Sequence, residues 1–159
     1  MSKFEVHRTV TAKPETVFDV FTDHRGYANL VGLIKSSELE QEGEPAPNGL
    51  GAIRVIRLPG ATVREQVTEF GRPGRYSYRM LSGAPLHNFV ATVTFRPNDE
   101  GGTDVTYLVS EDPSVRIVKP VIDKVVKKSF VMFTDAAVAK AAELTAHEPP
   151  DDPESPRGS

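Results

Sequence analysis

The chain has 159 residues, of which 38% are hydrophobic and 26% charged, as expected for a single globular domain. It contains no cysteine, which excludes disulfides, thiolate catalysis and cysteine-ligated metals. The net charge of −3 comes entirely from the last fourteen residues, AHEPPDDPESPRGS. The rest of the chain is neutral and lacks the surplus of lysine and arginine that nucleic-acid binding requires, so no nucleic-acid partner is expected.

The first part of the chain predicts one strand followed by two short helices. KFEVHRTVT alternates apolar and polar residues, as a half-buried strand does. Neither this segment nor a later one is apolar for long enough to be a signal peptide or a membrane span, so we expect a cytoplasmic protein with no integral membrane insertion. In TAKPETVFDVFTD, Pro14 suits the first turn of a helix, and Phe18 and Phe21 fall on one face. A second short helix is expected at about residues 27–33, after the break at Gly26.

The middle of the chain, from Ile34 to Glu111, predicts about six strands joined by turns. Segments rich in Pro, Gly and Asn recur there at hairpin spacing, as EPAPNG, LPGA, GRPG, SGAP and NDEGG. Consecutive strands joined by such short turns pair antiparallel, so this region predicts an antiparallel sheet.

The last predicted element is a long amphipathic helix from Pro120 to about Leu144. Its apolar residues are spaced three or four apart and share one face; they are Ile122, Val126, Phe130, Phe133, Ala137, Ala141 and Leu144. Only the apolar face of the sheet offers enough surface to bury this stripe. The sequence therefore predicts an α+β domain over residues 1–146, with helices on one face of a curved antiparallel sheet. Residues 147–159, acidic and rich in proline, are predicted to be a disordered tail.

An ion pair on an apolar face is predicted in RVIRLPGATVREQ, residues 54–66. Counting outward from the LPGA turn places Ile56 opposite Val63. Two residues further from the turn, Arg54 lies opposite Glu65. Side chains on one face of a strand pair recur every second residue, so the arginine and the glutamate share the apolar face.

The same counting predicts an inward face that is rich in aromatic residues. Around the NDEGG turn it places Val93 opposite Tyr107, and the same parity turns Phe89 and His87 inward. The predicted ligand-binding residues are Arg54, Ile56, Val63, Glu65, Tyr76, Tyr78, His87, Phe89, Val93, Tyr107, Phe130 and Phe133. Small-molecule sites have this composition, with apolar walls and a few convergent polar groups.

Each polar member of this set allows a structural interpretation beside a functional one. Arg54 and Glu65 are either a self-neutralising salt bridge or polar anchors in a cavity, and the two roles can coexist. His87 is either a proton donor and acceptor near neutral pH or an ordinary residue at a strand end. The tyrosines are core residues by default, with hydroxyls that reach water. The four histidines lie in separate elements without ligand spacing, so no metal site and no cofactor are expected.

In the order of its segments, the chain resembles the START-like, or SRPBCC, superfamily, which includes polyketide cyclase/dehydrase-like and Bet v 1-like proteins. The resemblance covers residues 3–144 and is carried by TAKPETVFDVFTD, GLGAIRVIRLPG, VREQV, SGAPLHNFVATVTF and GGTDVTY. It implies a helix-grip fold, in which a seven-stranded sheet wraps around the long C-terminal helix and leaves a cavity. It also implies that an acidic ligand-contacting residue occupies the position of Glu65, and that LPGA lies at the rim like a gating loop.

Two functions fit these expectations. The first is the binding, transport or sensing of a small hydrophobic molecule, such as a lipid, a polyketide or an isoprenoid-like compound, by a monomer or homodimer. The alternative is an enzyme of the polyketide cyclase, aromatase or dehydratase kind, in which His87 or Glu65 acts as general base on a poly-ketone. A carboxylate held by an arginine is a weak base, which favours binding over catalysis. A third class, a protein-interaction adaptor, predicts a large apolar surface patch.

Overall fold

The computed structural model describes residues 2–113 and 116–148. The seven strands form one antiparallel sheet in the order β1-β7-β6-β5-β4-β3-β2. The elements in chain order are β1 (Ser2–Val10), α1 (Pro14–Thr22), a 3₁₀ helix (His24–Gly26), α2 (Tyr27–Leu30), β2 (Ser36–Gln41), β3 (Ile53–Leu58), β4 (Ala61–Gly71), β5 (Arg75–Ser82), β6 (Leu86–Pro97), β7 (Thr103–Pro113), a second 3₁₀ helix (Arg116–Val118) and α3 (Lys119–Ala146). The predicted helix-grip fold is confirmed.

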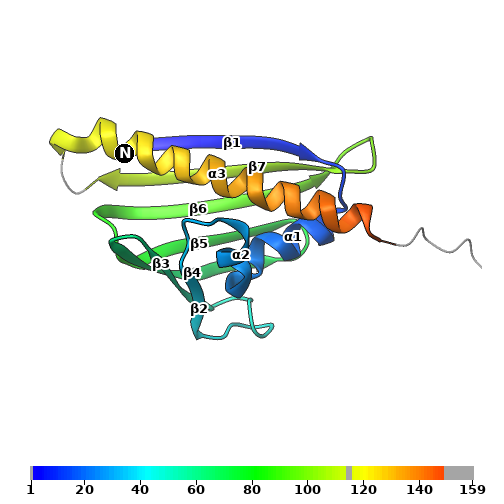
Figure 1. The fold of residues 1–159 in the computed structure, drawn as a ribbon, viewed down its shortest axis with the longest axis horizontal. Helices are drawn as coiled ribbons and strands as arrows, with labels where there is room; N and C mark the ends of the chain where they lie inside the picture. Colours follow the sequence, from blue (N-terminus) through cyan, green and yellow to red (C-terminus); the bar gives the residue numbers. More distant parts are fainter. Residues whose placement is uncertain (1, 114–115, 149–159) are drawn as a thin grey trace, which may run out of the picture.

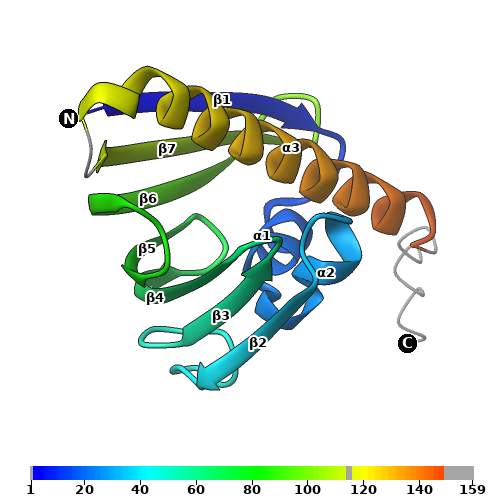
Figure 2. The same ribbon diagram turned by 60° about the vertical axis from the view of Figure 1, so that its left-hand side comes forward.

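All of the helices lie on one side of the sheet. Figure 1 shows α3 crossing the sheet from the end of β7, with α1 and α2 beside its C-terminal half. In Figure 2 the sheet is curved from β1 to β2, and the helices occupy its concave side. The inward-facing residues of the strands therefore face α1, α2 and α3.

The predicted hairpin registers are confirmed. Ile56 pairs with Val63 and Arg54 with Glu65, and Val93 pairs with Tyr107. The LPGA turn fits a two-residue hairpin loop, because Gly60 adopts a φ of +76° that glycine tolerates without strain. The ion pair therefore lies on the inner face, as the sequence predicted.

The prediction that His87 faces the interior is wrong. Between His87 and Val90 the register of β6 with β7 shifts, and Asn88 adopts a positive φ of +52°. This bulge reverses the alternation, since Phe89 remains buried while Leu86 packs against the core and His87 is exposed.

The two halves of α3 are packed differently. In the C-terminal half, Ala137 and Ala141 are completely buried, and their small side chains allow α1 to approach closely. In the middle of the helix, Phe130 and Phe133 are partly buried against the core. Leu144, which was predicted to share this buried stripe, is 41% exposed because the last turns of α3 extend past the strands (Figure 1).

The predicted tail and the possible membrane spans are the remaining features of the fold. Most of the predicted tail, residues 149–159, lies outside the described residues. None of the helices in the described part of the chain is long and apolar enough to cross a membrane.

Glu111 is a buried acid near the end of β7. Its side chain is completely buried. Burial, with a further contribution from the carboxyl group of Asp123 in α3, raises the pKa of Glu111 to about 7 from its ordinary value of 4.5. Native Glu111 therefore binds its proton at a pH at which the unfolded chain has already lost it.

The free energy of unfolding should consequently fall as the pH rises from about 4.5 to 7, by on the order of 1–3 kcal/mol through this residue. Above pH 7 no further loss is expected from it. A Glu111→Gln variant should lack this pH dependence and be more stable than the wild type at pH 8, as measured by urea denaturation. Glu38→Gln, at an exposed position on β2, is the control and should leave the dependence unchanged. An unchanged pH dependence in Glu111→Gln contradicts the assignment.

Candidate functional site

A buried arginine lies at the centre of the candidate site. Arg54 is 2% exposed and Glu65 6% exposed, and the Nε of Arg54 donates to the Oε2 of Glu65 over 2.6 Å. The strand alternation of β3 and β4 turns both side chains toward the helices. Burial of a single charge in this position is costly, so each charge depends on the other.

The remaining partners of Arg54 come from the helical segment after α1. Its Nη1 donates to the hydroxyl of Tyr27 over 2.6 Å and lies 3.1 Å from the Nδ1 of His24. The Tyr27 hydroxyl in turn donates to the carbonyl of Phe21 at 2.5 Å. The Nε2 of His24 lies 3.1 Å from the carbonyl of Asn48, to which it donates. One guanidinium group thereby connects the sheet to α1, the 3₁₀ helix and α2.

Aromatic rings cover the faces of the guanidinium. Its Cζ atom lies 4.0 Å from the ring centroid of Tyr78 and 5.0 Å from that of Tyr27, both within the range of cation–π attraction. The hydroxyl of Tyr78 is hydrogen-bonded to that of Tyr107. The ion pair is thus enclosed by phenol rings as well as hydrogen-bonded at its edges.

The hydrogen bonds fix the protonation states of the cluster. Burial, together with the positive charge of Arg54, lowers the pKa of His24 to about 3. His24 is therefore neutral at pH 7, with its proton on Nε2 and its Nδ1 accepting from Arg54. Burial raises the pKa of Tyr27 well above its ordinary value, so the phenol keeps the proton that it donates to Phe21.

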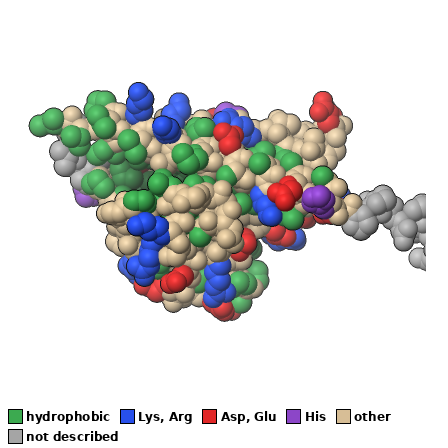
Figure 3. Space-filling model, viewed as in Figure 1, with side chains coloured by type: hydrophobic (Ala, Val, Ile, Leu, Met, Phe, Trp, Pro, Cys, Tyr) green, Lys and Arg blue, Asp and Glu red, His purple; other side chains and the backbone are tan. Residues whose placement is uncertain are grey.

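A small pocket leads from the surface to this cluster. Its volume is about 140 Å³, and it lies between the sheet, the segment after α2, and the middle of α3. It is lined by Tyr27, Val31, Leu33, Ile34, Arg54, Ile56, Leu58, Glu65, Tyr78, Tyr107, Ser129, Phe130, Met132 and Phe133. Leu33 and Met132 are 49% and 44% exposed and mark the mouth, whereas the buried Arg54 and Glu65 mark the floor. In Figure 3 hydrophobic side chains gather beside a hollow at the N-terminal half of α3.

The structure brings together seven of the twelve predicted site residues around this pocket: Arg54, Ile56, Glu65, Tyr78, Tyr107, Phe130 and Phe133. Val63, Tyr76, Phe89 and Val93 are buried on the same inner face but lie outside the pocket lining. His87 is exposed and is also outside the lining. The LPGA turn, which was expected at the rim, contributes Leu58 to the lining.

The sequence-based prediction missed His24 and Tyr27. Both follow the first predicted helix in a segment without strand alternation, so no register placed them opposite Arg54. A signal was present in composition, because a histidine and a tyrosine need hydrogen-bond partners when they are buried. Burial does occur, since His24 is 0% and Tyr27 2% exposed.

A larger hollow lies elsewhere on the molecule. It has a volume of about 890 Å³ and runs between α1, α2 and the C-terminal half of α3. Its lining includes Asp19, Asp23, Lys140 and Glu143, which are charged groups at an open surface rather than buried polar anchors. Among the described residues no group of three or more His, Asp and Glu side chains is placed to hold a metal ion. The pocket at Arg54 is therefore the better candidate for a small-molecule site.

The long helix laid over a curved seven-stranded sheet gives the chain a Bet v 1-like fold. The chain belongs to the polyketide cyclase/dehydrase and lipid transport family, which matches residues 1–143. A comparison with curated protein sequences gave no match.

Several solved structures share the fold at low sequence identity. The Zhui aromatase/cyclase from Streptomyces sp. R1128 has a TM-score of 0.78 and 16% identity over 91% of this chain and 95% of that one. A START superfamily protein from Mycobacterium smegmatis has a TM-score of 0.76 and 12% identity over 89% and 98%. Norcoclaurine synthase from Thalictrum flavum, in complex with dopamine and hydroxybenzaldehyde, has a TM-score of 0.72 and 14% identity over 93% and 88%. At these identities the likeness shows the fold alone.

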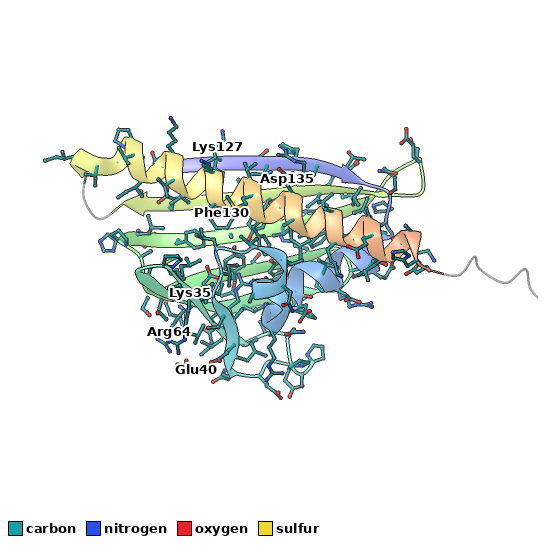
Figure 4. All side chains as sticks on the ribbon, viewed as in Figure 1. Lys35, Glu40, Arg64, Lys127, Phe130 and Asp135 are labelled. Atoms are coloured by element: carbon teal, nitrogen blue, oxygen red, sulfur yellow. The ribbon has the colours of Figure 1, made fainter. Side chains whose placement is uncertain are left out.

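Removal of one partner of the buried pair should be far more damaging than removal of a matched surface partner. Glu65→Ala leaves the Arg54 charge buried without its counter-ion and should lower the free energy of unfolding by about 3–5 kcal/mol. Glu40 and Arg64 form a salt bridge of the same 2.6 Å length at the exposed side of β2 and β4 (Figure 4). Glu40→Ala should cost less than about 1 kcal/mol.

Urea denaturation of both variants measures the difference. The double variant Arg54→Met/Glu65→Leu should recover part of the loss, because it leaves no buried charge unpaired. Full recovery is not expected, since the variant also removes the hydrogen bonds of Arg54 to His24 and Tyr27. Equal losses for Glu65→Ala and Glu40→Ala contradict the burial of the pair.

Acidification should destabilise the protein through His24. The unfolded histidine binds a proton near pH 6.5, whereas the folded one does so only near pH 3. Lowering the pH from 7 to 5 should therefore reduce the free energy of unfolding by about 2 kcal/mol through this residue. His24→Gln, which cannot titrate, should lose this dependence.

Glu111 acts in the opposite direction in this pH range, so the comparison is best made in a Glu111→Gln background. His7→Gln, at an exposed histidine, is the control and should retain the His24-dependent loss. The same pH dependence with and without His24 contradicts the neutral assignment.

Proposed function

We propose that this protein binds a small hydrophobic molecule with one polar end, as a carrier or sensor, in the pocket between the sheet and α3. The observation that carries the proposal is the course of the pocket, from an apolar, partly exposed mouth to a buried ion pair. Apolar walls supply affinity by burial of surface, at about 25 cal/mol per Å². Polar groups at the closed end orient the ligand.

The ion pair itself supports a role beyond stability. Well-packed apolar residues at the positions of Arg54 and Glu65 would be equally stable or more so. A polar floor in an apolar pocket is, by contrast, useful for a ligand that has a polar group to satisfy. The family to which the chain belongs includes lipid transport proteins by name, which agrees with a hydrophobic ligand.

An enzyme of the polyketide cyclase or dehydratase kind is the second candidate. The family description and the fold shared with the Zhui aromatase/cyclase favour it. The positions of the histidines weigh against an enzyme. His87 is exposed, and both ring nitrogens of His24 are already occupied, because Nε2 donates to Asn48 and Nδ1 accepts from Arg54. Glu65 is then the remaining candidate for a general base. Its ion pair with Arg54 makes it a poor one, because a carboxylate held by an arginine is a weak base.

Fragment binding followed by NMR tests the proposal. Apolar single-ring fragments should bind with a Kd on the order of 1 mM, equivalent to about −4 kcal/mol, and should shift the amide signals of pocket residues such as Ile56 and Ser129. Ser129→Trp places a large side chain at the mouth and should abolish binding. Lys127→Trp adds the same side chain to α3 at a position about 160° around the helix from Ser129. Lys127 lies outside the pocket lining, so this variant should bind normally.

Three results decide between the alternatives. Fragment shifts that lie away from the pocket, or unimpaired binding by Ser129→Trp, argue against a ligand site here. Turnover of a poly-ketone that Glu65→Gln abolishes while fragments still bind would support the enzyme. Binding without turnover supports the carrier or sensor.

A further inference from the structure

We propose that the pocket takes a neutral ring that bears a hydroxyl group, such as a phenol or a cyclic alcohol, with the hydroxyl at Glu65. An apolar tail on the ring leaves past Leu33 and Met132. This inference rests on the proposed function and names the class of ligand for the same pocket.

The volume of the pocket limits what can be enclosed. Pockets that enclose whole drug-sized ligands measure about 300–1,000 Å³, whereas this one measures about 140 Å³. A cavity of about 150 Å³ is known to accept benzene. One six-membered ring with a small substituent therefore fits, and an extended poly-ketone does not.

The walls of the pocket favour a ring over a flexible chain. Five of the lining residues are aromatic: Tyr27, Tyr78, Tyr107, Phe130 and Phe133. The centroids of Tyr107 and Phe130 lie 5.2 Å apart in a tilted arrangement. Aromatic pairs at such distances gain from edge-to-face and offset contacts, which a ring between them would extend.

The floor of the pocket offers one unused acceptor. Glu65 accepts from Arg54 through Oε2, and no group among the described residues donates to its Oε1. Glu65 is also a lining residue of the pocket. An unpaired carboxylate oxygen that faces a pocket is an acceptor for a hydrogen bond, so the occupant of the pocket is expected to supply a donor.

The tyrosine pair in the lining also offers an unused donor. The hydroxyls of Tyr78 and Tyr107 are bonded to each other, so one of their two protons is committed and the other has no acceptor among the described residues. A ligand hydroxyl both donates and accepts. It can therefore meet Glu65 and the tyrosine pair together, which a methyl, an ether or a ketone cannot do.

The charge of the floor excludes an anionic end. Arg54 and Glu65 already neutralise one another, and the guanidinium is further engaged by Tyr27 and His24. A ligand carboxylate would have to be buried beside Glu65 without a free counter-ion, at high cost. A neutral hydroxyl avoids this cost.

The surface outside the mouth accommodates an apolar tail. Val125 and Val121, one and two turns before Ser129 on α3, are 59% and 64% exposed. With Met132 they form an apolar ledge that continues from the pocket mouth along the helix. A tail lying on this ledge would bury side chains that are otherwise exposed to water.

Three compounds with the same ring and tail test the polar end. Calorimetric titration of the wild-type protein would compare 4-butylphenol, 4-butyltoluene and 4-butylbenzoate. The methyl group of the toluene has nearly the size of a hydroxyl and is more hydrophobic. A pocket that made no hydrogen bond to the hydroxyl would therefore bind the toluene more tightly than the phenol. We expect the phenol to bind at least ten-fold more tightly than the toluene, a difference of about 1.4 kcal/mol, and the benzoate to bind weakest.

The outcomes separate this inference from the proposed function. If the toluene or the benzoate binds as tightly as the phenol, the hydroxyl assignment is wrong while the pocket remains a binding site. If none of the three compounds and no ring fragment binds, both the assignment and the proposed function fail.

A pair of variants tests the tail. Val125→Ser should weaken the binding of 4-hexylphenol about two- to five-fold and leave that of 4-methylphenol unchanged, since only the longer tail reaches the ledge. Leu50→Ser alters a leucine that is also exposed, at 52%, but lies outside the pocket lining, and it should affect neither compound. An equal loss for both phenols, or no loss for 4-hexylphenol, overturns the position of the tail.

Discussion

The buried guanidinium of Arg54 is the constraint on which the arrangement of the site depends. A charge at this depth is tolerated only when it is paired and hydrogen-bonded, and the partners of Arg54 come from separate parts of the chain. Glu65 approaches from the neighbouring strand, whereas His24 and Tyr27 approach from the helical segment on the concave side. The satisfied arginine therefore sets where α1 and α2 sit on the sheet, because a displaced helix would leave its hydrogen bonds unmade.

The pocket follows from this arrangement together with the uneven packing of α3. Ala137 and Ala141 allow the C-terminal half of the helix to lie close against α1. Further toward its N-terminus, Phe130 and Phe133 meet tyrosines of the sheet and of α2, and large rings cannot fill the space between them completely. The unfilled volume lies directly above the ion pair. Its small size results from the same tyrosines that enclose Arg54.

Local rules explain what could be predicted from the sequence. The position of Arg54 opposite Glu65 needed only the two-residue period of a strand and a recognisable turn, and both were present. The prediction of the orientation of His87 failed because a bulge at Asn88 adds one residue to β6. The asparagine alone could not reveal this bulge, because asparagine is also common in turns. The contact of His24 with Arg54 depends on how a helix docks on a sheet, which no periodicity encodes. The volume of the pocket is a small difference between large packed volumes, so it also lies beyond pattern counting.

Arg54 and Glu65 contribute both to the stability of the fold and to the candidate binding site. Arg54 uses Nε and Nη1 to hold the fold together, and Glu65 uses one oxygen for the fold and leaves the other unused. A ligand that meets Glu65 therefore adds a hydrogen bond without taking one from the structure. A ligand that competes for the Nε or Nη1 of Arg54 would have to break contacts that position two helices. The division of work between the two charges thus favours a neutral donor at the floor of the pocket over a second carboxylate, which would be buried beside Glu65.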